Sequence, residues 1–166
     1  MSNADSDMAL DKTAYQRRIE PLLPAFLTAD CAQRIRPALR EALHYTTQGA
    51  EGEVVIRLYQ SEGDLRLTFS SSSPVYPVEA VRDYLLSISE HESLGQLYWR
   101  KCAVRMRMER RAYSICEMLA IAEYVVLDVD VRKVELVFRL PSKGLERRSL
   151  CALAPYLFLE RNGAIF

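Results

Sequence analysis

The sequence has few of the residues that usually carry catalysis or bind metals. Its 166 residues include only two histidines and four cysteines, and no two cysteines form a CxxC pair. The cysteines lie far apart along the chain, at Cys31, Cys102, Cys116 and Cys151. This spacing favours buried, reduced thiols over a disulfide framework or a zinc site. We therefore expect structural cysteines and no metal.

An excess of charge of one sign and long apolar runs are also missing. The chain has 22 Lys and Arg against 22 Asp and Glu, so its net charge gives no argument for nucleic acid or an anionic membrane. No apolar run reaches the roughly 20 residues that a membrane-spanning helix needs. The first residues are polar and acidic, unlike a signal peptide. We expect a cytoplasmic protein.

Hydrophobic periodicity predicts an α+β fold. Because 49% of the residues are apolar, the chain can bury one core. Helical spacing covers residues 14–27, 28–48, 78–89, 97–111 and 113–123, and alternation predicts strands at 54–59, 65–69, 124–131 and 134–140. Thr28 or Asp30 can cap the second helix, and Pro37 is expected to kink or restart it. This order predicts a two-layer α/β sandwich, with a mixed, mainly antiparallel sheet and helices on one face. We divide the chain into a flexible 1–13, a domain at 14–142 and an apolar extension at 143–166.

Three segments, in this order, carry a resemblance to a known family. Arg40-Glu41-Ala42-Leu43-His44-Tyr45 is similar to an E-A-L-x-N helix, residues 67–77 are similar to L-T-V-x-D-N-G-P-G-I-P, and residues 110–119 are similar to G-L-G-L-S-I-x-x-x-L. Residues 134–141 also resemble the family's final strand, which ends in Leu-Pro. The chain thus resembles a degenerate histidine-kinase-like ATPase domain, of the superfamily that includes gyrase, a heat-shock chaperone, histidine kinases and mismatch-repair ATPases. The anti-sigma kinases are the branch that it resembles most.

The same resemblance implies that ATP binding has been lost. In the family, an Asn holds Mg²⁺, an Asp binds adenine and glycines let backbone amides close on phosphate. Other residues stand at these nucleotide-binding positions here: Tyr45, Ser71, Ser73, Val75, Arg110 and Ala112. Glu41 matches the family's acidic position and would be the catalytic residue of an active enzyme. We expect no cofactor.

Four other polar residues have structural interpretations. His44 is expected to be a partly buried helix residue, and His91, between two glutamates, a solvated one. Asp128 and Asp130 share a strand face and could suggest a metal site. Alternation instead predicts that they form the exposed face of a half-buried strand.

A basic segment offers one surface for a partner. It contains Arg100, Lys101, Arg105, Arg107, Arg110 and Arg111 against the single Glu109. This face could dock an acidic protein or contact phosphate, or it could be a solvated helix side paired with acids elsewhere. Tyr98 and Trp99 do not alternate with the charges as a stacking platform would, so we do not expect nucleic acid.

The apolar tail offers a second surface. Leu153, Leu157 and Phe158 belong to a stretch that would expose too much contiguous apolar surface if left in water. The tail therefore either packs on its own domain as an extra part of the core or covers another chain, as in a homodimer.

The leading hypothesis is a non-catalytic, pseudokinase-like regulatory protein of bacterial signalling that acts by protein–protein interaction. The main alternative is an active, divergent ATP-dependent protein kinase that keeps Glu41 as its base. A secretion-type chaperone is the third, although such chaperones are often acidic and this chain is neutral.

Overall fold

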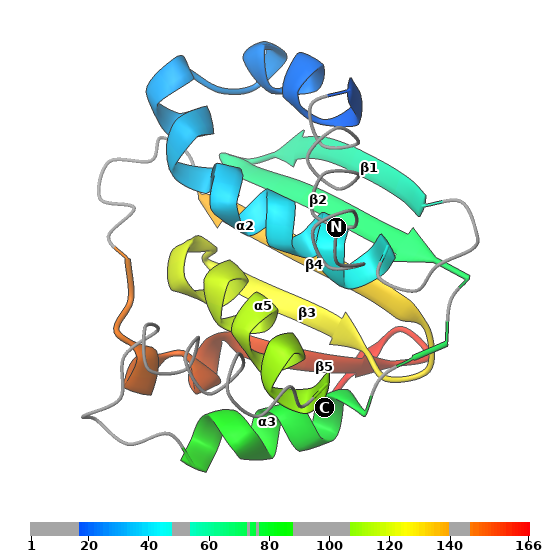
Figure 1. The fold of residues 1–166 in the computed structure, drawn as a ribbon. Coiled ribbons are helices and arrows are strands. Elements are labelled where there is room, and N and C mark those ends of the chain that lie inside the picture. The colour runs from blue at the N-terminus through cyan, green and yellow to red at the C-terminus, as the bar shows by residue number, and fades with distance from the viewer. Residues whose placement is uncertain (1–16, 48–53, 73, 76, 88–106, 140–146) are drawn as a thin grey trace, which may run out of the picture.

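The chain folds into one sheet with its helices on one face. The computed structural model describes residues 17–47, 54–72, 74–75, 77–87, 107–139 and 147–166. The helices are α2 (Ala29–Thr47), α3 (Val78–Ser87) and α5 (Arg107–Ile121), with short 3₁₀ helices η1 (Glu20–Ala25), η2 (Leu150–Ala152) and η3 (Ala154–Tyr156). The strands are β1 (Val54–Ser61), β2 (Asp64–Ser71), β3 (Tyr124–Asp128), β4 (Arg132–Arg139), β5 (Leu157–Arg161) and β6 (Ala164–Ile165) (Figure 1). No helix in these ranges is both long and apolar enough to cross a membrane.

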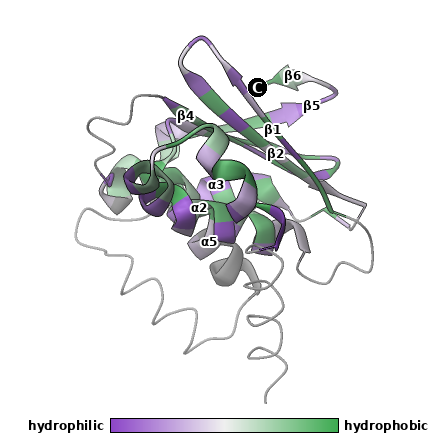
Figure 2. Ribbon diagram, turned by 90° about the horizontal axis from the view of Figure 1, so that it is seen from above, coloured by the Kyte–Doolittle hydropathy of each residue, from purple (hydrophilic) through white to green (hydrophobic). Residues whose placement is uncertain are grey.

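The sheet confirms the predicted fold class. Its strand order is β1-β2-β4-β3-β5-β6, and only β3 and β5 run parallel to each other. Seen from above, α2, α3 and α5 lie together on one side of it (Figure 2). In this two-layer α+β sandwich, none of the described helices covers the other face of the sheet.

The β1–β2 hairpin forms where alternation predicts it. Glu62 and Gly63 occupy the two turn positions with φ of 48° and 86°. Two consecutive positive φ angles are typical of the tight turn whose twist matches that of the flanking strands. In β2, Leu65, Leu67 and Phe69 face the helices and are fully buried.

The helices bury the stripes that their spacing predicts. Ile35, Leu39 and Leu43 of α2 are fully buried in the core, as are Ile115 and Leu119 of α5. The Thr28 hydroxyl accepts a hydrogen bond from the Cys31 N–H at 3.3 Å, so Thr28 rather than Asp30 caps α2.

Pro37 does not restart α2. The helix is one element from Ala29 to Thr47, and Pro37 lies on its exposed side. Its ring removes one backbone hydrogen bond, at a cost of about 3 kcal/mol. Burial of Ile35, Ala38 and Leu39 on both sides of the proline offsets that cost.

Three details of the sequence analysis are wrong. The strand predicted at 124–131 ends at Asp128, so Val131, 47% exposed, lies in the turn that follows it. Asp128 is only 8% exposed, although alternation predicted a solvated carboxylate. Its Oδ1 accepts hydrogen bonds from the N–H groups of Asp130 and Val131 at 2.8 and 2.9 Å, and these bonds close the turn to β4.

The third detail concerns the cysteines. Cys151 is exposed, whereas Cys31 and Cys116 are buried as expected; Cys102 lies outside the described residues.

The described part of the C-terminal extension packs on its own domain. β5 pairs with β3 and places Leu157 and Leu159 in the core, together with Leu153. Arg148 fastens the segment to the end of α5, because its guanidinium donates to the carbonyls of Leu119, Ala122 and Glu123. Of the two alternatives for the tail, these residues adopt self-docking.

Candidate functional site

Two of the three segments that carry the resemblance lie on α2 and α5, and the third runs from β2 into the loop before α3. The helices α2 and α5 pack directly on each other. The half-buried carboxylate of Glu41 accepts a hydrogen bond from the Ser114 hydroxyl of α5, with 2.7 Å between the oxygens. Glu41, the expected base of an active enzyme, therefore joins two helices.

The degenerate positions that the structure describes belong to the packing of the domain. Tyr45 is only 1% exposed and is part of the core cluster. Ser71 is buried at the end of β2, where it lies between Val54 of β1 and Arg132 of β4. Val75 is half-buried in the loop before α3. Ser73 lies outside the described residues, as do the side chains of Arg110 and Ala112 in α5, so the predicted proximity of Tyr45 and Arg110 stays a prediction.

The predicted partner-binding residues are only partly described. Arg100, Lys101 and Arg105 lie outside the described residues, and for Arg107 and Arg111 only the position in the first turns of α5 is described. In the tail, Leu153 and Leu157 are buried in the chain's own core and cannot contact a partner. Phe158, 37% exposed, is the one of the three that still can.

Two reactive groups of α5 are held in the interior. Burial, followed in size by the neighbouring Glu117 charge, raises the pKa of Cys116 to about 12, so this thiol stays protonated. Glu117 is itself buried, and its carboxylate accepts a hydrogen bond from the Arg147 guanidinium, with 2.7 Å between the nitrogen and the oxygen. A nucleophilic cysteine needs a lowered pKa and access, and Cys116 has neither.

The open face of the sheet carries exposed apolar and aromatic side chains among charged ones. Arg66 and Glu135, on neighbouring strands, form an ion pair at 3.0 Å. Burial, the largest single influence, lowers the pKa of Arg66, but the hydrogen bond to Glu135 and the charges of Tyr124, Glu135 and Tyr59 together outweigh it, so the pKa is raised. Phe158 packs edge-on against Tyr124 with 5.6 Å between ring centroids, and Tyr59 of β1 is 45% exposed.

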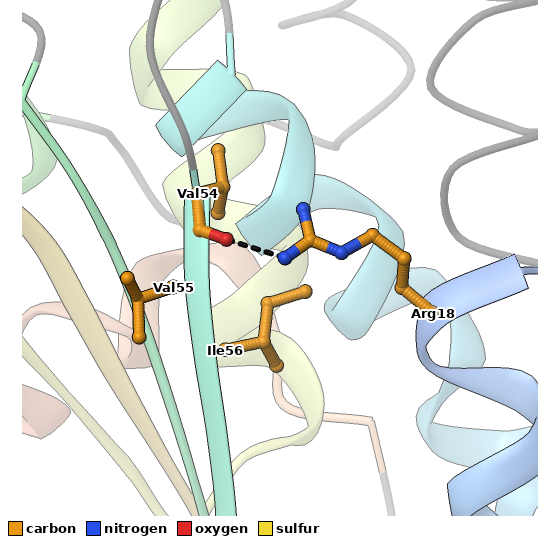
Figure 3. A pocket seen from close by; sticks show the side chains of 4 residues that line it. All are labelled: Arg18, Val54, Val55 and Ile56. Carbon is orange, nitrogen blue, oxygen red and sulfur yellow. Dashed lines mark hydrogen bonds between the residues drawn. The ribbon is translucent and has the colours of Figure 1, made fainter.

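A cavity of about 420 Å³ opens at the start of β1, the strand at one edge of the sheet. It is lined by Arg18, Val54, Val55 and Ile56. The guanidinium of Arg18, a helical residue just before η1, donates to the Val54 carbonyl (Figure 3). Ile56 lies on the same side of the strand as Arg18, and Val55 on the other.

The two arginines at this edge have no carboxylate partner in the described chain, unlike six other cations; the exposed Arg17 and Arg34 form no ion pair there either. Arg36, Arg66, Lys133, Arg139, Arg147 and Arg161 each contact a carboxylate. Arg18 and Arg57 are exposed, and neither forms an ion pair in the ranges that the structure describes. The sequence analysis did not single out these two residues. Arg57 stands out in the sequence only as the charged residue in an apolar strand; that this strand is an edge is decided by the tertiary structure.

Comparison with known proteins returned no match: no family model, no curated protein and no solved structure is significantly similar to this chain. The resemblance to the ATPase superfamily therefore rests on the motifs quoted above.

Proposed function

We propose that this protein is a non-catalytic regulatory protein that acts by binding another protein, in the cytoplasm and within bacterial signalling. The burial of Tyr45, at the position where the resemblance expects a magnesium ligand, carries the proposal. Magnesium at a nucleotide site needs oxygen ligands that reach the phosphates. A phenol that is 1% exposed and packed in the core contributes to folding instead.

The contacts of Glu41 support the same interpretation. A general base must be within hydrogen-bond reach of the proton that it abstracts. Here one carboxylate oxygen of Glu41 is 2.7 Å from the Ser114 hydroxyl, on a helix that packs against its own. We propose that Glu41 positions α5 and that no phosphoryl transfer takes place at this residue.

The test is the binding of Mg-ATP, measured by isothermal titration calorimetry and by thermal shift. We expect neither heat of binding nor a rise in Tm for the full chain. Glu41→Gln is the matched variant, because an amide oxygen can still accept from Ser114. Its Tm should therefore stay within about 2 °C of the parent.

An active kinase would behave differently in both assays. Micromolar binding of Mg-ATP, with phosphorylation of any protein substrate that is lost in Glu41→Gln, would refute the proposal. The partner that we propose is a protein with an acidic surface, and a second copy of the chain is the alternative. The exposed arginines beside β1 favour the acidic partner.

A further inference from the structure

The outer edge of β1 carries backbone groups that no other strand pairs with in the described part of the chain. β1 pairs with β2 in a register that runs from Val54↔Ser71 to Ser61↔Asp64. Because the turn has two residues, Ser61 and Asp64 exchange both hydrogen bonds, and bonded pairs recur at every second residue. Tyr59, Arg57 and Val55 thus point their N–H and C=O groups toward β2. The groups of Ile56, Leu58 and Gln60 point outward.

The contact of Arg18 agrees with this assignment. Val54 is in phase with Ile56 and Leu58, and its carbonyl is taken by a residue outside the sheet. Within the described ranges, no other element bonds to the backbone of Ile56, Leu58 or Gln60 on that side. Native proteins usually block such edges with bulges, prolines or covering segments, because an open edge binds further strands.

The side chains along the edge define what kind of strand would fit. A strand added to β1 would place alternate side chains beside Ile56 and Leu58, which are half-buried and face the helices. These positions favour apolar residues. The intervening positions would lie beside Arg57 on the open face, whereas Arg18 lies on the same side of β1 as Ile56 (Figure 3). Arg57 has no carboxylate partner within the described ranges, and it therefore favours acidic residues at these open-face positions.

We propose that the outer edge of β1, from Ile56 to Gln60, binds an extended segment of a partner protein in which apolar and acidic residues alternate. This proposal rests on the protein-binding function proposed above and assigns it a surface. The backbone bonds would provide most of the affinity, and Arg57 would select acidic over basic segments. Arg18 already covers the Val54 carbonyl, so the bound segment would end there.

The experiment uses the full chain and two short synthetic peptides, one alternating valine with glutamate and one alternating valine with lysine. Amide hydrogen exchange, followed by NMR, reports on each N–H group. A bound strand slows exchange by the factor 1 + [L]/Kd, so about 1 mM peptide with a Kd of about 0.2 mM gives about sixfold protection. We expect this protection at Ile56, Leu58 and Gln60 with the acidic peptide, and less than about twofold with the basic one.

Three variants test the two parts of the proposal. Arg57→Glu should weaken the acidic peptide about tenfold and make the basic peptide the better ligand. Gln60→Pro removes one outward N–H without interrupting the β1–β2 hydrogen bonds, so it should also weaken binding. Arg34→Glu is the matched control, because Arg34 is exposed on α2 and the charge change is the same. It should change Kd by less than about twofold.

The remaining outcomes each refute this assignment. If the acidic peptide protects none of the three amides, or the basic peptide protects them equally, the edge is not an acidic-segment site. Protection elsewhere on the chain would reject this surface but leave a protein-binding function standing, whereas Mg-ATP binding would reject that function. If the three amides are protected without peptide and lose protection on dilution, a second copy of the chain occupies the edge.

Discussion

Replacement of Leu159 by alanine should strongly destabilise the domain, although this residue lies in the part of the chain beyond the ATPase resemblance. Leu159 is 1% exposed on β5 and belongs to the core cluster. A Leu→Ala change at such a site costs about 2–5 kcal/mol. Its neighbour Phe158 faces the open side of the sheet and packs edge-on against Tyr124. Phe158→Ala should therefore cost at most about 1.5 kcal/mol and is the matched control.

Urea unfolding followed by circular dichroism measures both variants. With a slope of about 2 kcal/mol per M, a loss of about 3 kcal/mol lowers the midpoint by about 1.5 M. Ending the chain after Gly144 is the stronger form of the same test. It removes Leu153, Leu157 and Leu159, which together contribute about 5–9 kcal/mol of burial. That is comparable with the whole stability of a domain, about 5–15 kcal/mol, so the shortened chain should not fold.

Light scattering completes the experiment. A shortened chain that stays folded and monomeric would show that the tail is an interface, and the argument from burial would be wrong. Equal midpoints for Leu159→Ala and Phe158→Ala would refute it as well, because one side chain is in the core and the other is partly in water.

Arg148→Ala should lower the free energy of unfolding by about 2–4 kcal/mol, because the guanidinium of Arg148 donates to several carbonyls at the end of α5. Arg148→Lys should lower it by nearly as much. A loss below about 0.5 kcal/mol for Arg148→Ala in urea titrations would contradict this role. Cys151, which is exposed, should react quickly with a thiol reagent, and Cys151→Ser should remove one fast-reacting group, whereas Cys116→Ala should remove none. The pKa of Cys116 is raised from its ordinary value of 9.0 to about 12, so the native state keeps a proton that the unfolded chain loses. The free energy of unfolding should therefore fall as pH rises from 9.0 toward 12, by up to about 1.4 kcal/mol per pH unit. Cys116→Ala should flatten this slope in urea titrations. An unchanged slope would refute the raised pKa of Cys116. Asp128→Ala should lower the free energy of unfolding by about 1–2 kcal/mol in thermal unfolding, because two backbone N–H groups lose their acceptor. Asp128→Asn keeps an acceptor oxygen and should cost less. Equal losses for the two variants would show that Asp128 does not act as the acceptor that closes this turn.

The local pattern of the chain was sufficient to predict the hairpin and the buried helix stripes. Leu65, Leu67 and Phe69 alternate in β2 and are all buried, because a strand points successive side chains to opposite faces. The stripe of Ile35 and Leu39 is buried for the analogous helical reason. These periods depend only on residues a few positions apart, so they can be read without knowing what the element packs against.

The tertiary structure decided which strands are neighbours and therefore which residues are exposed. Val137 points to the open face, yet it is fully buried because Arg66 and Tyr124 lie beside it on the two adjacent strands. Leu157 belongs to a strand only because its segment pairs with β3, more than twenty positions earlier in the chain. The same long-range pairing leaves β1 at the rim, where Arg57 has no carboxylate beside it within the described ranges. An alternating pattern cannot distinguish a central strand from an edge, because that difference depends on contacts between segments distant in sequence.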